Sequence, residues 1–239
     1  MTRLQSELTR LYLAAPAPPG GAVAPFVDAQ GRVRALVLEV VQPVAWDILS
    51  RVWQGVQAEL DLPAPAIAVS GTDGLQLWFS LEGPIEAAYA HAFLESLRTR
   101  WLADVAPTRV RLLPDPAAPT RPVPRVPAPQ ADGDHWSAFI APDLAAIFSE
   151  TPWLDVEPGE EGQAALLRGL QSIKPVAFAD AVARLDARAL AQAPVALVAR
   201  SEANEPTDDP RRFLLRVMND ESVPLALRID AAKALLPRA

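Results

Sequence analysis

The sequence contains no cysteine in its 239 residues, and its imidazoles are limited to His91 and His135. Without cysteine the chain has no disulfide, no thiolate nucleophile and no sulfur-ligated metal. A metal site would therefore have to be built from carboxylates, and carboxylate oxygens favour a hard ion such as Mg²⁺ or Mn²⁺ over zinc.

Long hydrophobic runs are also missing. No apolar stretch approaches the roughly 20 residues that span a bilayer, because even the run at 36–41 is interrupted by Glu39. Glu7 lies where a signal peptide would need an apolar core. Half of the residues are apolar and 21% are charged, which is typical of a chain with a buried core. The sequence therefore predicts a folded cytoplasmic protein with no membrane partner.

The chain lacks an excess of positive charge. Its formal net charge is −7 and its pI is about 4.9. This balance opposes the broad electrostatic attraction that drives non-specific DNA binding, so it argues against a DNA-coating role. Net charge does not say where the charges lie, and a local basic groove stays open as an alternative.

Apolar periodicity predicts a compact N-terminal domain. Leu4, Leu8 and Leu11 recur at helical spacing and predict a short amphipathic helix at 2–14. The next elements are predicted as strands at 23–28 and 32–41, a helix at 44–60, strands at 66–70 and 75–81, a helix at 84–102 that opens on Pro84, and a strand at 108–113. This order indicates an α+β fold of the split βαβ type, with an antiparallel or mixed sheet.

A proline-rich stretch follows. Prolines recur at every second or third position between 114 and 129, and each removes a backbone donor and fixes φ. We expect an extended connector, with a polyproline ligand for a partner's aromatic groove as the alternative. The predicted organisation is an α+β domain at 1–113, a linker at 114–134 and a helical region at 135–239.

Within that last region, the predicted helices are at 141–150, 160–173 and 177–190, followed by two amphipathic segments at 209–220 and 223–237. Amphipathic helices in such a region are a candidate surface for a protein partner.

The segments VLEVVQP at 37–43 and AIAVSGTDGLQLWFSL at 66–81, each followed by a helix, carry a family resemblance. Over about residues 33–115 the chain resembles the catalytic core of the archaeo-eukaryotic primase superfamily, and most closely the polymerase domain of bacterial end-joining ligases. The resemblance implies nucleotidyl transfer, in which carboxylates hold two divalent cations near the triphosphate.

The hairpin of that family carries a Ser-Gly…Gly-Leu-His segment. Ser70, Gly71, Gly74 and Leu75 match it, and Gln76 stands where the histidine is expected. Glycines in such a hairpin allow the backbone to approach phosphates. A glutamine can form hydrogen bonds but cannot act as a general base.

The acidic residues that the resemblance implies are mostly absent. The expected pair on the first strand is reduced to Glu39, because its alternate neighbours are Val37 and Val41. Asp115, between two prolines, is the remnant of a third acid. One carboxylate does not hold two metals, so the resemblance implies a primase-like scaffold with a degenerate active site. If the site were active, Glu39 would be its metal ligand and Mg²⁺ or Mn²⁺ its cofactor.

A groove for nucleotide or single-stranded nucleic acid is expected to be formed by Ser70, Gly71, Gly74, Gln76, Arg34 and Arg111. The simpler interpretation of the glycines is a tight hairpin turn. Gln76 alternates with leucines and is expected to face solvent or the groove. Glu39 lies in an apolar strand, where an unpaired carboxylate is costly, so it needs Arg34, Arg111, a metal or an exposed edge. Trp78 is a candidate for base stacking, although core packing explains it more simply.

The segment 209–237 resembles a tail found in phage small-terminase-like and other mobile-element proteins. The leading hypothesis from the sequence is a non-catalytic, primase-like, nucleic-acid-associated protein of a bacterial mobile element or phage-derived system. The alternatives are a protein–protein interaction or scaffold module without nucleic-acid binding, and a metal-dependent nucleotidyltransferase.

Overall fold

The structure is a computed structural model that describes residues 1–13, 27–43, 46–116, 125–131 and 133–192. The chain divides into two compact units, Met1–Ala189 and Leu190–Ala239, and the fold of the first unit is described below. It is an α+β protein whose described part has a curled, six-stranded antiparallel sheet, a half-barrel, and five α-helices. None of the described helices is long and apolar enough to cross a membrane.

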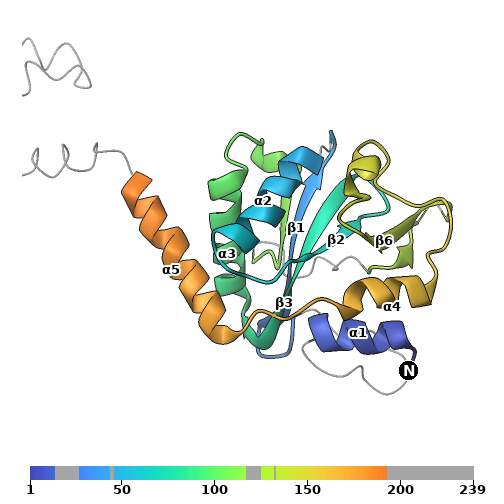
Figure 1. Cartoon of the computed structure of the whole chain (residues 1–239), viewed down its shortest axis with the longest axis horizontal. Coiled ribbons are helices and arrows are strands. Elements are labelled where there is room, and N and C mark those ends of the chain that lie inside the picture. The colour runs from blue at the N-terminus through green and yellow to red at the C-terminus, as the bar shows by residue number, and fades with distance from the viewer. Residues whose placement is uncertain (14–26, 44–45, 117–124, 132, 193–239) are drawn as a thin grey trace, which may run out of the picture. The chain divides into compact units, whose positions relative to one another are not determined.

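Figure 1 shows the elements in place. The α-helices are α1 (Arg3–Tyr12), α2 (Trp46–Ala58), α3 (Ala87–Trp101), α4 (Glu160–Arg168) and α5 (Pro175–Gln192). The strands are β1 (Arg32–Val41), β2 (Ala66–Val69), β3 (Gly74–Glu86), β4 (Val110–Leu113), β5 (Ala128–Pro129) and β6 (Trp136–Ile140). Two short 3₁₀ helices are η1 (Pro107–Arg109) and η2 (Ala145–Ser149).

The strands lie in the order β4-β1-β3-β2-β6-β5, and each neighbouring pair is antiparallel. β1 and β2 therefore run parallel to each other with β3 between them, and α2 connects the two. In the same way, β3 and β4 are parallel with β1 between them, and α3 makes that connection. This strand order places the middle of β1 between β3 and β4.

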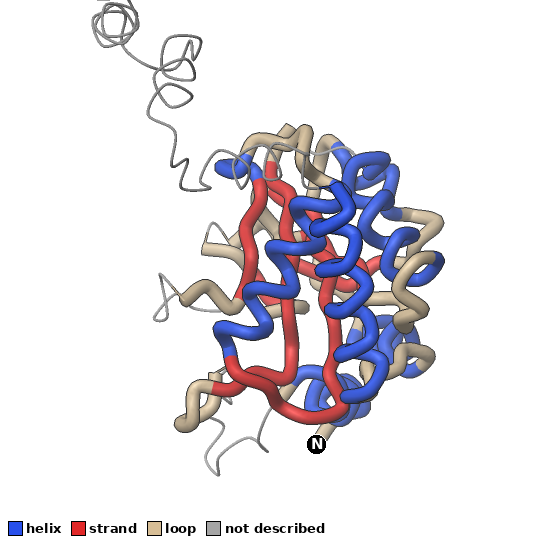
Figure 2. Tube along the Cα trace, turned by 90° about the vertical axis from the view of Figure 1, so that its left-hand side faces the viewer, coloured by secondary structure: helices blue, strands red, loops and turns tan. Residues whose placement is uncertain are grey.

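The two faces of the sheet have separate apolar cores. Alternation along β1 directs Leu36 and Leu38 to the face covered by α2, α3 and α5, and Ala35 and Val37 to the face covered at one end by α1 and α4. Figure 2, seen from the side of α5, shows helices lying in front of the strands. Polar residues of β1, β3 and β4 meet on the second face.

The predicted elements of the first hundred residues are largely confirmed, with one correction. β3 continues through Pro84 to Glu86, so Pro84 is a strand residue and α3 begins at Ala87. The extension pairs with the start of β1, where Arg32 lies opposite Glu86. Of the strand predicted at 23–28, Val27 forms a bridge with Val33, and residues 23–26 lie outside the described part.

The region after residue 134 is not purely helical. Trp136–Ile140 forms β6, which pairs with β2, and the predicted helix at 141–150 is reduced to the 3₁₀ helix η2. The helix predicted at 160–173 ends at Arg168. Without β6, the backbone N–H and C=O groups at the outer edge of β2 would have no strand to pair with. Trp136–Ile140, distant in the sequence, supplies that strand.

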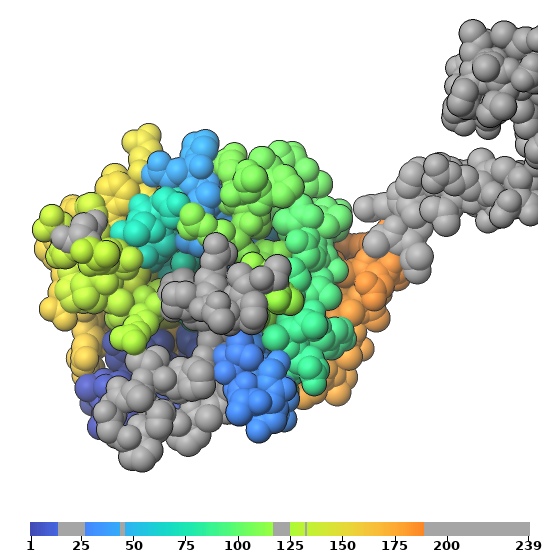
Figure 3. Space-filling view, turned by 180° about the vertical axis from the view of Figure 1, so that it is seen from behind, coloured from blue at the N-terminus to red at the C-terminus, as the bar shows by residue number. Residues whose placement is uncertain are grey.

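One sheet therefore spans the boundaries predicted at 113 and 135, since β4 precedes the predicted linker and β6 follows it. Residues 125–131 return to the sheet through β5, and Figure 3 shows this segment in yellow-green at the surface of the first unit. The prolines at 119–124 and the amphipathic segments at 209–220 and 223–237 lie outside the described residues.

Candidate functional site

The sheet register brings three of the predicted site residues together. Glu39 on β1 lies opposite Gln76 on β3 and opposite Arg111 on β4. Because paired residues of antiparallel strands project to the same face, the three side chains share the face opposite α2 and α3. The hairpin between β2 and β3 adds Asp73 at the end of this row.

Hydrogen bonds join these side chains into one network. Gln76 Nε2 donates to Glu39 Oε1 at 3.2 Å, and Arg111 Nη1 donates to Glu39 Oε2 at 3.4 Å. Arg111 also donates to both carboxylate oxygens of Asp73, at 3.0 and 2.9 Å. Trp78 Nε1 donates to Gln76 Oε1 at 2.8 Å. The pairing with Arg111 confirms one of the two arginine partners expected for Glu39.

The network is buried at its centre. Glu39 is 4% exposed and Gln76 is fully buried. The expectation that Gln76 faces solvent or an open groove is therefore wrong, because both ends of its amide are used inside the protein. Buried polar atoms need such partners, since an unsatisfied one costs about 1–3 kcal/mol.

The two carboxylates differ in electrostatics. Burial raises the pKa of Glu39, and the nearby charge of Arg111 offsets this only in part. Burial also acts to raise the pKa of Asp73, but the hydrogen bonds and charge of Arg111 outweigh it and lower that pKa. The hydrogen bond to Asp73 in turn raises the pKa of the Arg111 guanidinium. Arg111 is thus a fixed cation between two carboxylates.

The hairpin at Ser70–Gly74 is organised around its first hydroxyl. Ser70 Oγ accepts hydrogen bonds from the backbone N–H groups of Thr72, Asp73 and Gly74, at 3.1, 3.1 and 2.9 Å. Gly71 has φ +85°, a left-handed conformation that favours glycine. These contacts are those of a self-contained turn, as the simpler interpretation of the sequence proposed.

The two matching glycines are each in close contact with a side chain of this protein. A Cβ atom added to Gly71 would lie 2.6 Å from Gln130 Nε2, and one added to Gly74 would lie 2.7 Å from Glu39 Oε1. The need for glycine at both positions is therefore explained without a ligand. Gln130 and Glu39 therefore pack directly against the hairpin backbone at these two glycines.

Arg34 lies apart from this network. Its Nε donates to the carbonyl oxygen of Leu81 at 2.9 Å, and its terminal nitrogens donate to the carbonyl oxygens of Thr9, Arg10 and Leu13. The guanidinium thus satisfies carbonyl groups at the C-terminal end of α1, where a cation is favourable. Arg34 was expected to belong to the groove, and the structure gives it this structural role instead.

Asp115 follows β4, which ends at Leu113, so it lies outside the sheet that positions Glu39. His91 Nδ1 donates to the carbonyl oxygen of the adjacent Pro114 at 2.9 Å. Among the described residues, no group of three histidine, aspartate or glutamate side chains is placed to hold a metal ion. The structure therefore brings Gly74, Gln76 and Arg111 to Glu39, with Ser70 and Gly71 in the same hairpin as Gly74. Arg34 lies at the end of α1 instead.

Two members of the site, Asp73 and Gln130, were not identified as site residues from the sequence. Asp73 carries the residue type of a turn, and only the register of β3 against β1 and β4 reveals that it reaches Arg111. Gln130 approaches Gly71 because β5 pairs with β6. The sequence held one indication of Asp73. An arginine was predicted beside Glu39, and a guanidinium has enough donors to bind a second carboxylate as well.

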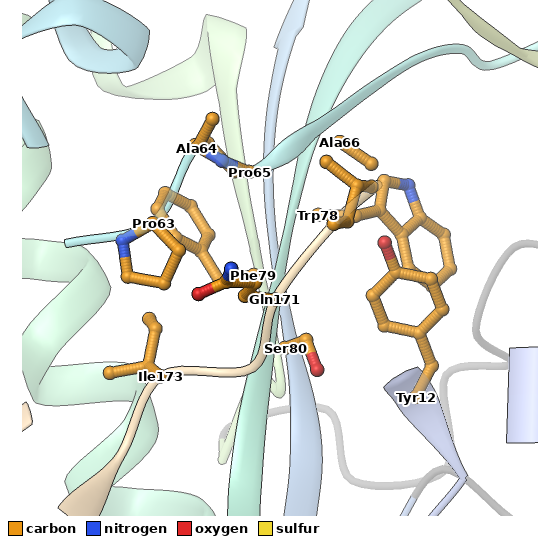
Figure 4. A pocket seen from close by; sticks show the side chains of 11 residues that line it. Tyr12, Pro63, Ala64, Pro65, Ala66, Trp78, Phe79, Ser80, Gln171 and Ile173 are labelled. Carbon is orange, nitrogen blue, oxygen red and sulfur yellow. The ribbon is translucent and has the colours of Figure 1, made fainter. Parts of the chain in front are cut away.

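Trp78 belongs to an aromatic cluster in the core rather than to an open surface. Its ring lies 5.3 Å from the ring of Tyr12 and 5.9 Å from that of Phe139. Figure 4 shows Tyr12 and Trp78 beside a shallow depression near Pro65 and Ser80, which has no interior room for a water molecule. Core packing therefore explains Trp78, as the simpler interpretation held.

Comparison with protein-family models and with curated proteins finds no match for this chain. The chemistry of the site therefore rests on its own geometry. A paired guanidinium, a buried amide and two bound carboxylates can stabilise a fold and exclude water. They leave no basic group at the position of the expected histidine, because that residue is Gln76.

Proposed function

We propose that this chain is a non-catalytic binding module on a primase-like scaffold, and that it binds protein rather than nucleic acid. The observation that carries the proposal is the position of Arg111 between Glu39 and Asp73. A cation of the protein itself thus pairs with Glu39, the one carboxylate that the resemblance would make a metal ligand, and it leaves both carboxylates paired.

The scaffold part of the proposal is supported by connectivity. The units β1-α2-β2 and β3-α3-β4 each enclose one inserted antiparallel strand, which is the split βαβ arrangement that the resemblance implies. Glu39 lies on the strand before the first crossover helix, and the Ser-Gly…Gly-Leu segment lies on the hairpin after it. This is the order that the resemblance implies, and it supports the scaffold part of the proposal.

The non-catalytic part follows from chemistry. Two-metal transfer needs carboxylates that are free to bridge cations in an open site. Glu39 is buried and Asp73 is held by two hydrogen bonds to Arg111. Releasing either carboxylate would take away one of the two partners of the Arg111 guanidinium, which is unfavourable, although solvent at the exposed part of Arg111 reduces the cost. The closed network is thus self-consistent without a metal.

Charge favours a protein partner over nucleic acid. The net charge is −7, and the two arginines expected to contact phosphate, Arg34 and Arg111, already donate to groups of the protein itself. Nucleic-acid association in a mobile-element or phage-derived system remains the competing proposal. Its separate support, the resemblance of 209–237 to phage small-terminase-like tails, falls outside the described residues.

The decisive experiment measures binding of a fluorescent single-stranded oligonucleotide and of a labelled nucleoside triphosphate by anisotropy, with and without Mn²⁺. The proteins are the full-length wild type, Glu39→Ala and, as a matched control, Glu82→Ala, which removes an exposed carboxylate from β3. We expect no binding of either ligand to any of the three.

Two results would contradict the proposal in different ways. Mn²⁺-dependent nucleotide binding that Glu39→Ala abolishes and Glu82→Ala preserves would establish a working metal site and favour the nucleotidyltransferase. Metal-independent oligonucleotide binding that weakens steeply with salt would favour the nucleic-acid-associated alternative.

A further inference from the structure

The start of α5 is fixed to the sheet. Just before the helix, the N–H of Ile173 donates to the carbonyl oxygen of Ser80 at 2.7 Å, and the N–H of Glu82 donates to the carbonyl oxygen of Ile173 at 2.9 Å. Ile173 is therefore tied to β3 as a short parallel bridge. The first turn of α5 begins two residues later, from a fixed point.

One apolar stripe packs the first half of α5 on the core. Phe178, Ala181 and Leu185 are buried at helical spacing. The Phe178 ring lies 4.8 Å from that of Phe93 and 5.5 Å from that of Tyr89, both on α3. Because these contacts are between aromatic rings, the packing of the first half of α5 against α3 does not depend on charge.

Beyond Leu185 the character of the helix changes. The side chains at 186–188 are exposed. Arg188 forms an ion pair with Glu59, which follows the last residue of α2. One turn earlier, Arg184 Nη1 donates to the carbonyl oxygen of Glu59 at 3.3 Å. The hydrogen bond and the ion pair described for 184–188 are thus both made with Glu59.

Glu59 also serves α3. Arg100 Nη2 donates to its carboxylate at 3.0 Å, so guanidinium groups from two helices meet at one carboxylate, with Arg184 beside them. These arginines lower the pKa of Glu59 against the effect of its partial burial. Without the negative charge, the guanidinium groups of Arg100 and Arg188 would lose the carboxylate that both contact, and the two cations would repel each other.

We infer that Glu59 is an electrostatic latch, which holds the second half of α5 on α2 and α3 and releases it when its ion pairs are removed or screened. The helix continues to Gln192, past residue 190 where the second unit begins.

The test is hydrogen–deuterium exchange of the full-length protein, read in peptides that cover 183–192. Glu59→Gln keeps the size of the side chain and removes its charge. The matched control is Glu95→Gln, which breaks the ion pair that Glu95 forms with Arg98 inside α3. A peptide covering 75–81 reports on global stability.

We expect exchange in 183–192 to rise about 3- to 5-fold in Glu59→Gln at low salt, the upper end of what one exposed ion pair provides. Wild type at about 1 M salt should approach the same rate, because salt screens exposed pairs. Glu95→Gln should match the wild type, and 75–81 should not change. Exchange in Glu59→Gln within twofold of the wild type would overturn the latch, as would an equal rise in Glu95→Gln or in 75–81.

Discussion

At the scale of single residues, Arg111 connects two carboxylates that would otherwise repel each other. One of them, Glu39, is buried, and the other, Asp73, is partly exposed. Removing one partner of a buried ion pair can lower the free energy of unfolding by more than the pair itself contributes, because the remaining charge is left buried and uncompensated.

We therefore expect Arg111→Ala to lower the free energy of unfolding by about 2 kcal/mol, less than for a fully buried pair because Arg111 is partly exposed. In a Glu39→Gln background the same change should cost about half as much. Urea denaturation of the four proteins measures this coupling. Arg98→Ala, which breaks the surface pair with Glu95, should cost less than about 0.5 kcal/mol. Equal costs for Arg111→Ala in both backgrounds would contradict the network.

The pKa of Glu39, raised by burial, has a consequence for pH dependence. A carboxyl group with a higher pKa in the folded chain binds more protons when folded, so it loses stability as pH rises through that pKa. Glu39→Gln removes this loss. The stability of the variant relative to the wild type should therefore increase from about pH 4 to about pH 8.

Urea denaturation across that pH range gives the difference directly. The lowered pKa of Asp73 acts in the opposite sense, since its stabilisation is lost as pH falls, and it is present in both proteins. A stability difference that stays constant or decreases with pH would show that Glu39 is not held in a desolvated position.

At the scale of elements, β6 depends on a side chain for part of its hydrogen bonding. Gln163 of α4 accepts from the N–H of Phe139 at 2.8 Å and donates to its carbonyl oxygen at 2.9 Å. The amide thus completes the edge of β6 beyond its short pairing with β5 and closes it to other strands.

Gln163→Leu should lower the free energy of unfolding by about 2 kcal/mol, because it leaves two buried backbone groups of Phe139 without partners. Arg168→Leu, at an exposed position of the same helix, should change it by less than about 0.5 kcal/mol. Thermal or urea denaturation distinguishes the two. A cost for Gln163→Leu as small as that of the control would mean that other groups satisfy the edge.

The elements that could be predicted from sequence are those with a local signal. The helix at 46–58 and the strands at 32–41 and 74–81 show regular periodicity between glycine or proline boundaries. The strand character of Pro84–Glu86 was missed because it arises from pairing with residues about fifty positions earlier. β6 was missed for the same reason, since Ile140 pairs with Ile67.

The candidate site divides in the same way. That Glu39 needs a partner was predictable, because an unpaired carboxylate in an apolar strand is costly, but the sequence left Arg34, Arg111, a metal and an exposed edge open. The register of β1 against β4 selects Arg111. The burial of Gln76 and the approach of Gln130 to Gly71 depend on how distant segments pack, which no local pattern encodes.

At the scale of the whole molecule, the sheet of the first unit needs segments from both sides of the predicted linker. A chain that stops at residue 134 lacks β6, α4 and the Ile173 bridge, and exposes the edge of β2. We expect residues 1–192 to unfold cooperatively on their own, and residues 1–134 to show no cooperative transition and weak near-UV circular dichroism. Cooperative unfolding of 1–134 would place an independent domain boundary at the linker.

The proposed function requires that Glu39 binds no divalent cation, because Arg111 already pairs with it. Its most direct test is a Mn²⁺ titration of the wild-type protein followed by electron paramagnetic resonance, which detects free Mn²⁺. We expect the free Mn²⁺ signal in the presence of the wild-type protein to equal the signal in buffer alone. The same equality is expected with nucleoside triphosphate present, after the Mn²⁺ bound to the nucleotide itself has been subtracted. Loss of free signal in the wild type that Glu39→Gln restores would show a metal at Glu39 and contradict the account.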